Sequence, residues 1–284
     1  MSNLCLANAS ESVLKTLKPA LALASLNAIS PSCFPVAQEY AKNSALLETD
    51  FLPLFMGKLL AENASVLARS FKGNLLIPLS PRNSFDAERL VDAAKTVQQH
   101  LDSSGVSLKR IGFIFPATWE GLIAGERLAR RGYLSAITHA ASLLQVAQAA
   151  DRGIRYILVP TAQIEEHPSS KPQDGVRLPL SFDAYLKAHG YQTEIVATDV
   201  PIAEQVELLA PYLLVALPEE LYTRCQKLPL KPPLELSVEP PPKLRTDEES
   251  FRFLINDDAR AEELLARGIR ASTEAYRNLE SYLA

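Results

Sequence analysis

From residue 74 to residue 216 the chain alternates short apolar runs with longer amphipathic segments, and this alternation limits the possible folds more than any other feature. Segments such as 86–101 carry apolar residues at helical spacing and stop before a glycine. Strands that alternate with helices in this way are typical of β-α units and a parallel sheet. The apolar runs predict strands at 75–79, 111–115, 134–138, 156–159, 194–198 and 212–216.

The first 70 residues contain two shorter apolar runs, at 4–6 and 21–24, and two helical stretches, at 35–47 and 51–70. These two runs would complete eight strands. With 284 residues and 47% hydrophobic content the chain can bury one large core, and α/β barrels of roughly 250 residues occur as single domains. The prediction is an α/β protein, a (β/α)8 barrel forming one domain over 1–284, with extra N- and C-terminal helices.

Three segments fall outside the regular alternation. Residues 160–180 are rich in Pro, Ser and Gln and are predicted to be a loop. Residues 228–243 hold six prolines and predict an extended segment on the surface. Residues 247–284 are strongly helical and carry apolar residues that can pack back on the barrel.

Composition excludes several classes of function. The net charge is −4 and the basic residues form no stripe, so we expect no binding to nucleic acid. Cys5, Cys33 and Cys225 have no C-x-x-C spacing, so they predict reduced thiols rather than a zinc site or a disulfide framework. We expect no metal and no cofactor. The N-terminus lacks a signal-like pattern, and the weakly apolar stretch 19–29 is too short to cross a bilayer, which predicts a cytoplasmic protein that binds no membrane.

Several motifs along the chain resemble the transaldolases. The run R-I-G-F-I-F-P-A-T-W-E-G at 110–121 is similar to the fourth strand of that family and the helix after it. R-N-S-F-D at 82–86, G-Y-L-S-A-I-T-H-A-A-S at 132–142 and the C-terminal helical stretch 252–270 resemble other family segments. The resemblance implies a (β/α)8 barrel that acts alone or as a homodimer.

The departures from the family fall on residues that do chemistry. The resemblance places the family's Schiff-base lysine at Ile114 and its catalytic glutamate at Pro78. A Schiff-base aldolase needs an amine, an acid-base carboxylate and cations for a phosphate. Neither the lysine nor the glutamate of the family is present at the position where the resemblance places it. Further polar site residues of the family are aligned with Ala7, Ser25, Ala136, Leu158, Gln163 and Pro201.

A few polar residues near predicted strand ends are candidates for chemistry. Asp199 follows the strand 194–198, at the barrel face that carries chemistry in such folds, although it could equally cap the next helix. Thr138 could hydrogen-bond a ligand or simply a backbone carbonyl. Ser80 and Arg82 follow the strand 75–79, and the resemblance gives Arg82 a structural role. His139 is expected from strand alternation to face the helices.

These residues lead to three hypotheses. Apolar residues at the family's polar positions predict a pocket for an apolar small molecule, lined by Pro78, Ala136, Ile114 and Leu158 with Ser80, Arg82 and Gln163. The first hypothesis is a repurposed cyclase, isomerase or lyase of specialised metabolism, in which Asp199 transfers a proton and Thr138 positions the substrate. The second is an inactive barrel that serves as a binding or partner subunit. The third is residual transaldolase or aldolase activity on sugar phosphates.

Overall fold

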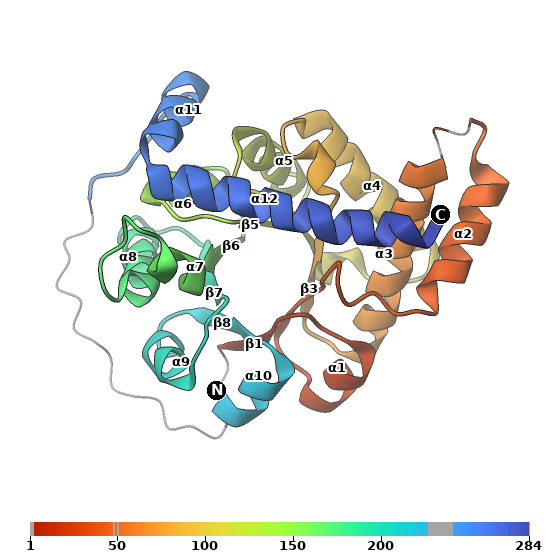
Figure 1. Cartoon of the computed structure of the whole chain (residues 1–284), viewed down its shortest axis with the longest axis horizontal. Coiled ribbons are helices and arrows are strands. Elements are labelled where there is room, and N and C mark those ends of the chain that lie inside the picture. The colour runs from red at the N-terminus through yellow and green to blue at the C-terminus, as the bar shows by residue number, and fades with distance from the viewer. Residues whose placement is uncertain (1–2, 48, 50, 227–240, 284) are drawn as a thin grey trace.

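The computed structural model describes residues 3–47, 49, 51–226 and 241–283. Eight parallel strands pair in chain order and close into a barrel, with β1 pairing with β8 through Leu4 and Val215 (Figure 1). This confirms the predicted (β/α)8 fold, including the two short N-terminal strands. The strands are β1 Leu4–Leu6, β2 Leu21–Leu23, β3 Asn74–Pro78, β4 Ile111–Pro116, β5 Leu134–Thr138, β6 Tyr156–Pro160, β7 Glu194–Thr198 and β8 Leu214–Leu217.

Strand alternation sorts each strand's side chains between the barrel interior and the helix layer. On β4, Phe113 and Phe115 are buried against the helices, whereas Ile114 packs in the interior cluster. Gly112 is required on the interior side, because an added Cβ there would lie 2.6 Å from Leu76. The interior is therefore filled with side chains, and it is a packed core rather than a channel.

The helices surround the barrel, and two of them, α2 and α3, lie between β2 and β3, one more than the regular repeat requires. The predicted helix 51–70 matches α3, while the predicted 35–47 begins and ends slightly earlier, as α2. The helices are α1 Glu11–Leu17, α2 Cys33–Ser44, α3 Phe51–Ser70, α4 Ala87–Ser103, α5 Trp119–Ala129, α6 Leu143–Asp151, α7 Thr161–Glu166, α8 Asp174–Ala188, α9 Ala203–Leu209, α10 Glu219–Cys225, α11 Glu248–Asp257 and α12 Ala259–Glu280, with a short 3-10 turn, η2, at Pro81–Asn83.

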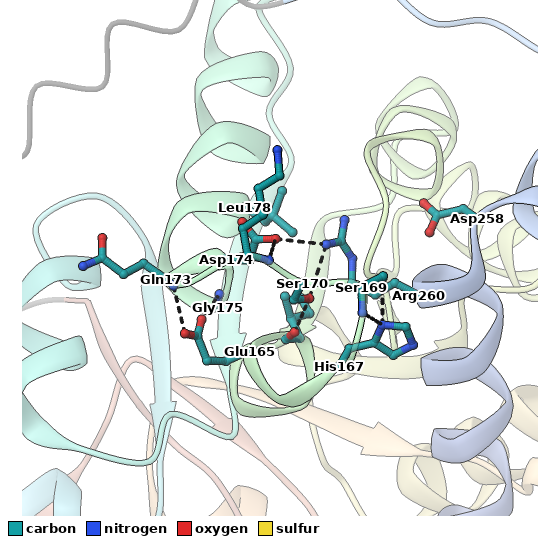
Figure 2. A network of polar contacts seen from close by, with 12 residues as sticks. Glu165, His167, Ser169, Ser170, Gln173, Asp174, Gly175, Leu178, Asp258 and Arg260 are labelled. Carbon is teal, nitrogen blue, oxygen red and sulfur yellow. Dashed lines mark hydrogen bonds and ion pairs between the residues drawn. The ribbon is translucent and has the colours of Figure 1, made fainter.

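The segment 160–180 differs from the prediction, because it contains α7 and the first turns of α8 rather than a continuous loop. Glu165 of α7 accepts the backbone N–H groups of Gln173 and Gly175, each at 2.8 Å, and so satisfies the N-terminus of α8 (Figure 2). The capping group lies eight to ten residues before its partners. A composition rich in Pro and Ser cannot reveal such a contact.

The last helix, α12, crosses the carboxyl-terminal face of the barrel (Figure 1). At its beginning, Arg260 lies 3.3 Å from Asp174 of α8. At its middle, Gly268 packs on His139 after β5. At its end, Glu280 accepts two hydrogen bonds from Arg82 of η2, at 3.0 and 2.6 Å. The predicted C-terminal helices therefore pack on the barrel, and α12 covers the side of its mouth formed by β3 and β5.

Two further predictions concern membrane-spanning helices and the proline-rich segment. Of the described helices, α3 alone is long and apolar enough to cross a membrane, and 61% of that window is buried inside the fold. The burial fits a helix of the protein core, and the cytoplasmic location stays a prediction. The proline-rich segment 228–243 falls almost entirely outside the described residues, which resume at 241.

Candidate functional site at the carboxyl-terminal face

Three residues that follow strands at this face have a left-handed backbone. Asn8 follows β1, His139 follows β5 and Asp199 follows β7, with φ of 51°, 62° and 55°. Asn, Asp and His are the side chains that most often adopt this conformation, and such residues gather at functional sites. In a strand, successive side chains point to opposite faces of the sheet. The left-handed turn ends this alternation, so it no longer predicts the direction of these three side chains.

The side of the mouth formed by β7, β8 and β1, here called the open half, contains a cavity of about 520 Å³. Asp199 lines it, and its Oδ2 accepts a hydrogen bond of 2.8 Å from the side-chain amide of Gln163. The cavity is further lined by Ala7, Asn8, Val200, Pro201, Ala216, Pro218, Glu220, Leu221 and Arg224. This volume lies in the range of small-molecule sites.

Asp199 is not a helix cap, because α9 begins at Ala203 and the residue before that helix is Ile202. The protein around the Asp199 carboxyl raises its pKa by desolvation, and the hydrogen bond from Gln163 offsets part of that rise. The side chain still reaches solvent at the cavity. A carboxyl group with a raised pKa at a barrel mouth is suited to taking and returning protons.

The opposite side of the mouth, here called the closed half, lies between β3, β4 and β5 under α12. Its cavity measures about 50 Å³ and is lined by Leu26, Pro78, Leu79, Ser80, Pro81, Ser84, Leu90, Ile114, Pro116, Thr138, His139, Ile269 and Ser272. A water molecule occupies about 30 Å³ of the liquid. The apolar residues here, Pro78, Ile114 and Pro116 among them, therefore pack together, and they leave room for about one or two water molecules.

His139 lies in this closed half, not against the helix layer as strand alternation predicts. Its ring packs so closely on α12 that a Cβ added to Gly268 would lie 2.2 Å from the ring Nδ1. Burial lowers the pKa of His139 to about 4, so the ring is neutral at pH 7. The positive φ of His139 explains the difference, because the chain turns before the ring is placed.

The structure divides the predicted site residues among several places. Asp199 and Gln163 meet at the open half. Thr138, Ser80, Pro78 and Ile114 line the small closed cavity. Ala136 and Leu158 lie deeper, in the buried interior cluster with Tyr156 and Val196. Arg82 pairs with Glu280 and lines a separate cavity of about 620 Å³ between α3 and α4.

Three polar residues of the open half were not among the candidates predicted from the sequence, namely Asn8, Glu220 and Arg224. The signal for Asn8 is its place two residues after β1, since residues following a barrel strand lie at the mouth. Glu220 and Arg224 lie on α10, one helical turn apart. They could have been found only by asking which face of that short helix turns toward the barrel.

The side chains of the A-T-W-E-G motif make contacts that hold the surrounding helices together. Thr118 caps α5 by accepting the N–H of Gly121 at 3.0 Å. The Trp119 ring lies 4.4 Å from the Arg152 guanidinium and 5.4 Å from the Phe251 ring. Glu120 pairs with Arg252 of α11. These contacts hold α11 and the neighbouring α6 against α5.

A second group of polar contacts ties the loop after α7 to α12 (Figure 2). The buried His167 accepts at Nδ1 from the Ser169 N–H at 3.2 Å, and its Nε2 lies 3.1 Å from Glu263 of α12. The Ser169 hydroxyl also lies 2.8 Å from Nδ1. Ser169 lines none of the cavities described above. We therefore assign this group to holding the helices together.

No metal centre is formed within 3–47, 51–226 and 241–283, because no three His, Cys, Asp or Glu side chains gather there. Cys5, Cys33 and Cys225 are buried free thiols. Burial raises the pKa of the Cys5 thiol to about 12, so it stays protonated and unreactive. The expectation of no metal and no cofactor stays a prediction.

The fold and the face define the class: a (β/α)8 barrel with its candidate site in the loops after the strands. The family model described as transaldolase/fructose-6-phosphate aldolase matches residues 19–283, and the chain belongs to this family. This confirms the family resemblance of the motifs.

Solved structures with similar architecture are distant in sequence. The lead(II) complex of malate synthase from Haloferax volcanii is 12% identical, with 99% of this chain and 89% of that chain covered and a TM-score of 0.47. A putative phosphonomutase from Burkholderia cenocepacia J2315 is 13% identical, with 78% and 88% covered and a TM-score of 0.44. Likenesses this distant say nothing of activity.

Proposed function

We propose that this transaldolase-family chain is an enzyme that moves a proton within a small molecule bound in the open half, as an isomerase, cyclase or lyase does, without forming a Schiff base. The proposal rests on the position of the Asp199 carboxyl in this cavity and on its raised pKa. Asp199 follows β7 on a left-handed turn, lines a cavity of about 520 Å³ and has a raised pKa.

The contacts of Asp199 suit this role. Its Oδ2 is held by Gln163, while its Oδ1 has no hydrogen-bond partner among the described residues. The free oxygen can accept a proton from one substrate atom and return it to another, so an isomerisation needs no co-reactant. The amide of Gln163 fixes the orientation of the carboxylate, which lowers the cost of positioning it in the transition state.

The lining of the open half supports a substrate with an apolar body. Ala7, Val200, Pro201, Ala216 and Leu221 supply apolar surface beside a few polar groups. Pockets for metabolites commonly combine these two features. The proposal thus keeps the predicted apolar small molecule, but it moves the binding site from Ile114 and Thr138 to the other half of the mouth.

The described residues that line the two halves of the mouth offer no amine that could form an imine with a substrate. Among the described residues, those lining the two mouth cavities include no lysine. Ile114 stands on β4 at the position that the family resemblance assigns to the Schiff-base lysine. Borohydride reduction with sugar phosphates or apolar ketones, followed by intact mass, should therefore give no adduct. A trapped adduct would favour residual aldolase activity instead.

Asp199→Asn tests the proposal even while the substrate is unidentified. Wild-type protein and the variant are incubated with a metabolite extract, and the compounds consumed and formed are compared by mass spectrometry. We expect the wild type to convert at least one compound and Asp199→Asn to lower that conversion at least about a hundredfold. Thr138→Val is the matched control, since Thr138 lies in the closed half, and it should act within about twofold of the wild type.

The opposite results would overturn the assignment. Full conversion by Asp199→Asn would remove Asp199 from the chemistry. Loss of conversion in Thr138→Val alone would move the site to the closed half. A non-catalytic barrel is the second candidate, favoured by the tight packing of Ile114 and its neighbours under α12. It predicts no conversion by the wild type and a stoichiometric partner on purification from the native cell.

A further inference from the structure

We infer that the open half binds its small molecule through a single anionic group, a carboxylate or a phosphate, held by Arg224. The inference deepens the proposed function by naming the substrate class of the same site. It rests on the proposed function in one respect, namely that this cavity is the substrate site. Binding of an anion can be measured whether or not a reaction takes place.

Arg224 and Asp199 reach the same cavity from different elements. Asp199 comes from the turn after β7, whereas Arg224 comes from α10, which follows β8. Glu220, Leu221 and Arg224 lie along one side of this helix and line the cavity together with Pro218, which precedes the helix. A ligand in the cavity would therefore contact a cation from α10 and an acid-base group from the β7 turn.

Eight of the 17 arginines form ion pairs with carboxylates among the described residues, and Arg224 is not one of them. Arg82, Arg127, Arg155 and Arg252 all form ion pairs with carboxylates. Glu220 precedes Arg224 by four residues, the order that favours an ion pair along a helix. No ion pair joins Arg224 to Glu220 or to any other described residue, so its guanidinium is free to bind an anion.

The alternative is an ordinary solvated arginine near the C-terminal end of a helix, where a cation is favoured. Its place in the cavity argues against this interpretation. A guanidinium offers parallel N–H donors that match the oxygens of a carboxylate or a phosphate. The side-chain amide of Asn8, in the same cavity, can add a further donor.

The two carboxylates of the cavity limit the charge of the ligand. Asp199 and Glu220 both line it, and like charges repel a second anionic group. A ligand with one anionic group and a neutral body fits this distribution of charges. With its anionic group on Arg224, the body of such a ligand extends toward Asp199.

Binding of two simple probes tests the inference. Butanoate and inorganic phosphate are titrated into the full-length protein by calorimetry, at an ionic strength held constant with sodium chloride. We expect the wild type to bind at least one probe, and Arg224→Gln to weaken that binding about tenfold or more. Arg131→Gln is the matched control, because Arg131 is also exposed just beyond a helix and forms no ion pair within the described residues. It should bind within about twofold of the wild type.

The probes and variants separate the outcomes. Binding of butanoate alone supports a carboxylate substrate, and binding of phosphate alone supports a phosphate ester. Wild-type affinity in Arg224→Gln, or no binding of either probe to the wild type, would overturn the inference. Asp199→Asn should bind the anion at least as tightly as the wild type, because the substitution removes a like charge from the cavity. If Asp199→Asn loses turnover while Arg224→Gln binds the anion normally, the proposed function stands and only the anion site is wrong. If Asp199→Asn keeps turnover while Arg224→Gln loses anion binding, the anion site stands and only the acid-base role of Asp199 is wrong.

Discussion

The closed and open halves of the barrel mouth share one scaffold and differ in what lies above the strand ends. The closed half is covered by α12, holds about 50 Å³ and contains the neutral His139. The open half holds about 520 Å³ and contains Asp199, Glu220 and Arg224. Apolar residues at a barrel mouth therefore do not by themselves make an apolar binding pocket.

Hydration explains why the two halves differ. Covering the apolar side chains of Pro78 and Ile114 with a helix removes apolar surface from water, which is favourable at roughly 25 cal/mol per Å². Covering Asp199, Glu220 and Arg224 would remove charged groups from water, which is costly unless each is paired. A helix at the mouth is therefore stable on the apolar half and not on the charged half.

Acid should weaken the closed half most strongly. The folded pKa of His139 is about 4, below its ordinary value of 6.5, so between these values the unfolded chain binds a proton that the folded chain does not. The free energy of unfolding should then fall as the pH drops from about 6.5 to 4, by at most roughly 3 kcal/mol from this group. Below pH 4 this group causes no further loss.

Urea unfolding at pH 7 and pH 4.5, in the wild type and in His139→Asn, checks this expectation. Asn accepts the left-handed backbone of this position and does not titrate. Burial also lowers the pKa of His100, so only the difference between the two proteins isolates His139. Equal pH dependence in both would contradict the assigned burial of this ring.

Gly268→Ala should destabilise the closed half by about 1–2 kcal/mol. Alanine usually stabilises a helix interior relative to glycine by roughly 0.5–1 kcal/mol. Here its Cβ would lie 2.2–2.4 Å from three atoms of the His139 ring, and overpacking of a core costs roughly 1–3 kcal/mol. The clash therefore outweighs the helix propensity. Urea unfolding midpoints give the net sign.

The same substitution in a His139→Gly background serves as the control. Without the ring there is no clash, and glycine retains the positive φ of that position. Gly268→Ala should then stabilise the protein by about 0.5–1 kcal/mol. A destabilisation in both backgrounds would mean that α12 is held against something other than His139.

Arg82→Gln should have the smallest effect, a loss of about 0.5 kcal/mol. Its bidentate pair with Glu280 joins η2 to the end of α12, but the Arg82 side chain is 49% exposed, and exposed pairs contribute about 0.2–1 kcal/mol. A double-mutant cycle with Glu280→Gln measures the coupling. Because Arg82 faces neither half of the mouth, anion binding at the open half should not change; a change would return Arg82 to the substrate site.

Much of the fold could be predicted from the sequence because the evidence was local. Each strand from β3 to β8 is an apolar run between turn signals, and each following helix shows its own periodicity. The helix α7 escaped prediction, and the true start of α8 was missed, because Glu165 caps α8 from a different element. For the site, strand ends pointed to Asp199 and Thr138, but nothing local distinguished which strand ends α12 would cover.

The sequence by itself determined the barrel and the family, since periodicity and motifs are properties of neighbouring residues. Only the tertiary structure decided that Thr138 is enclosed while Asp199 stays open, and that Arg224 joins Asp199 at one cavity. The path of α12 across the mouth depends on contacts between residues as distant in the chain as Arg82 and Glu280. Such contacts form only when the folded chain brings their elements together, so no local pattern could record them.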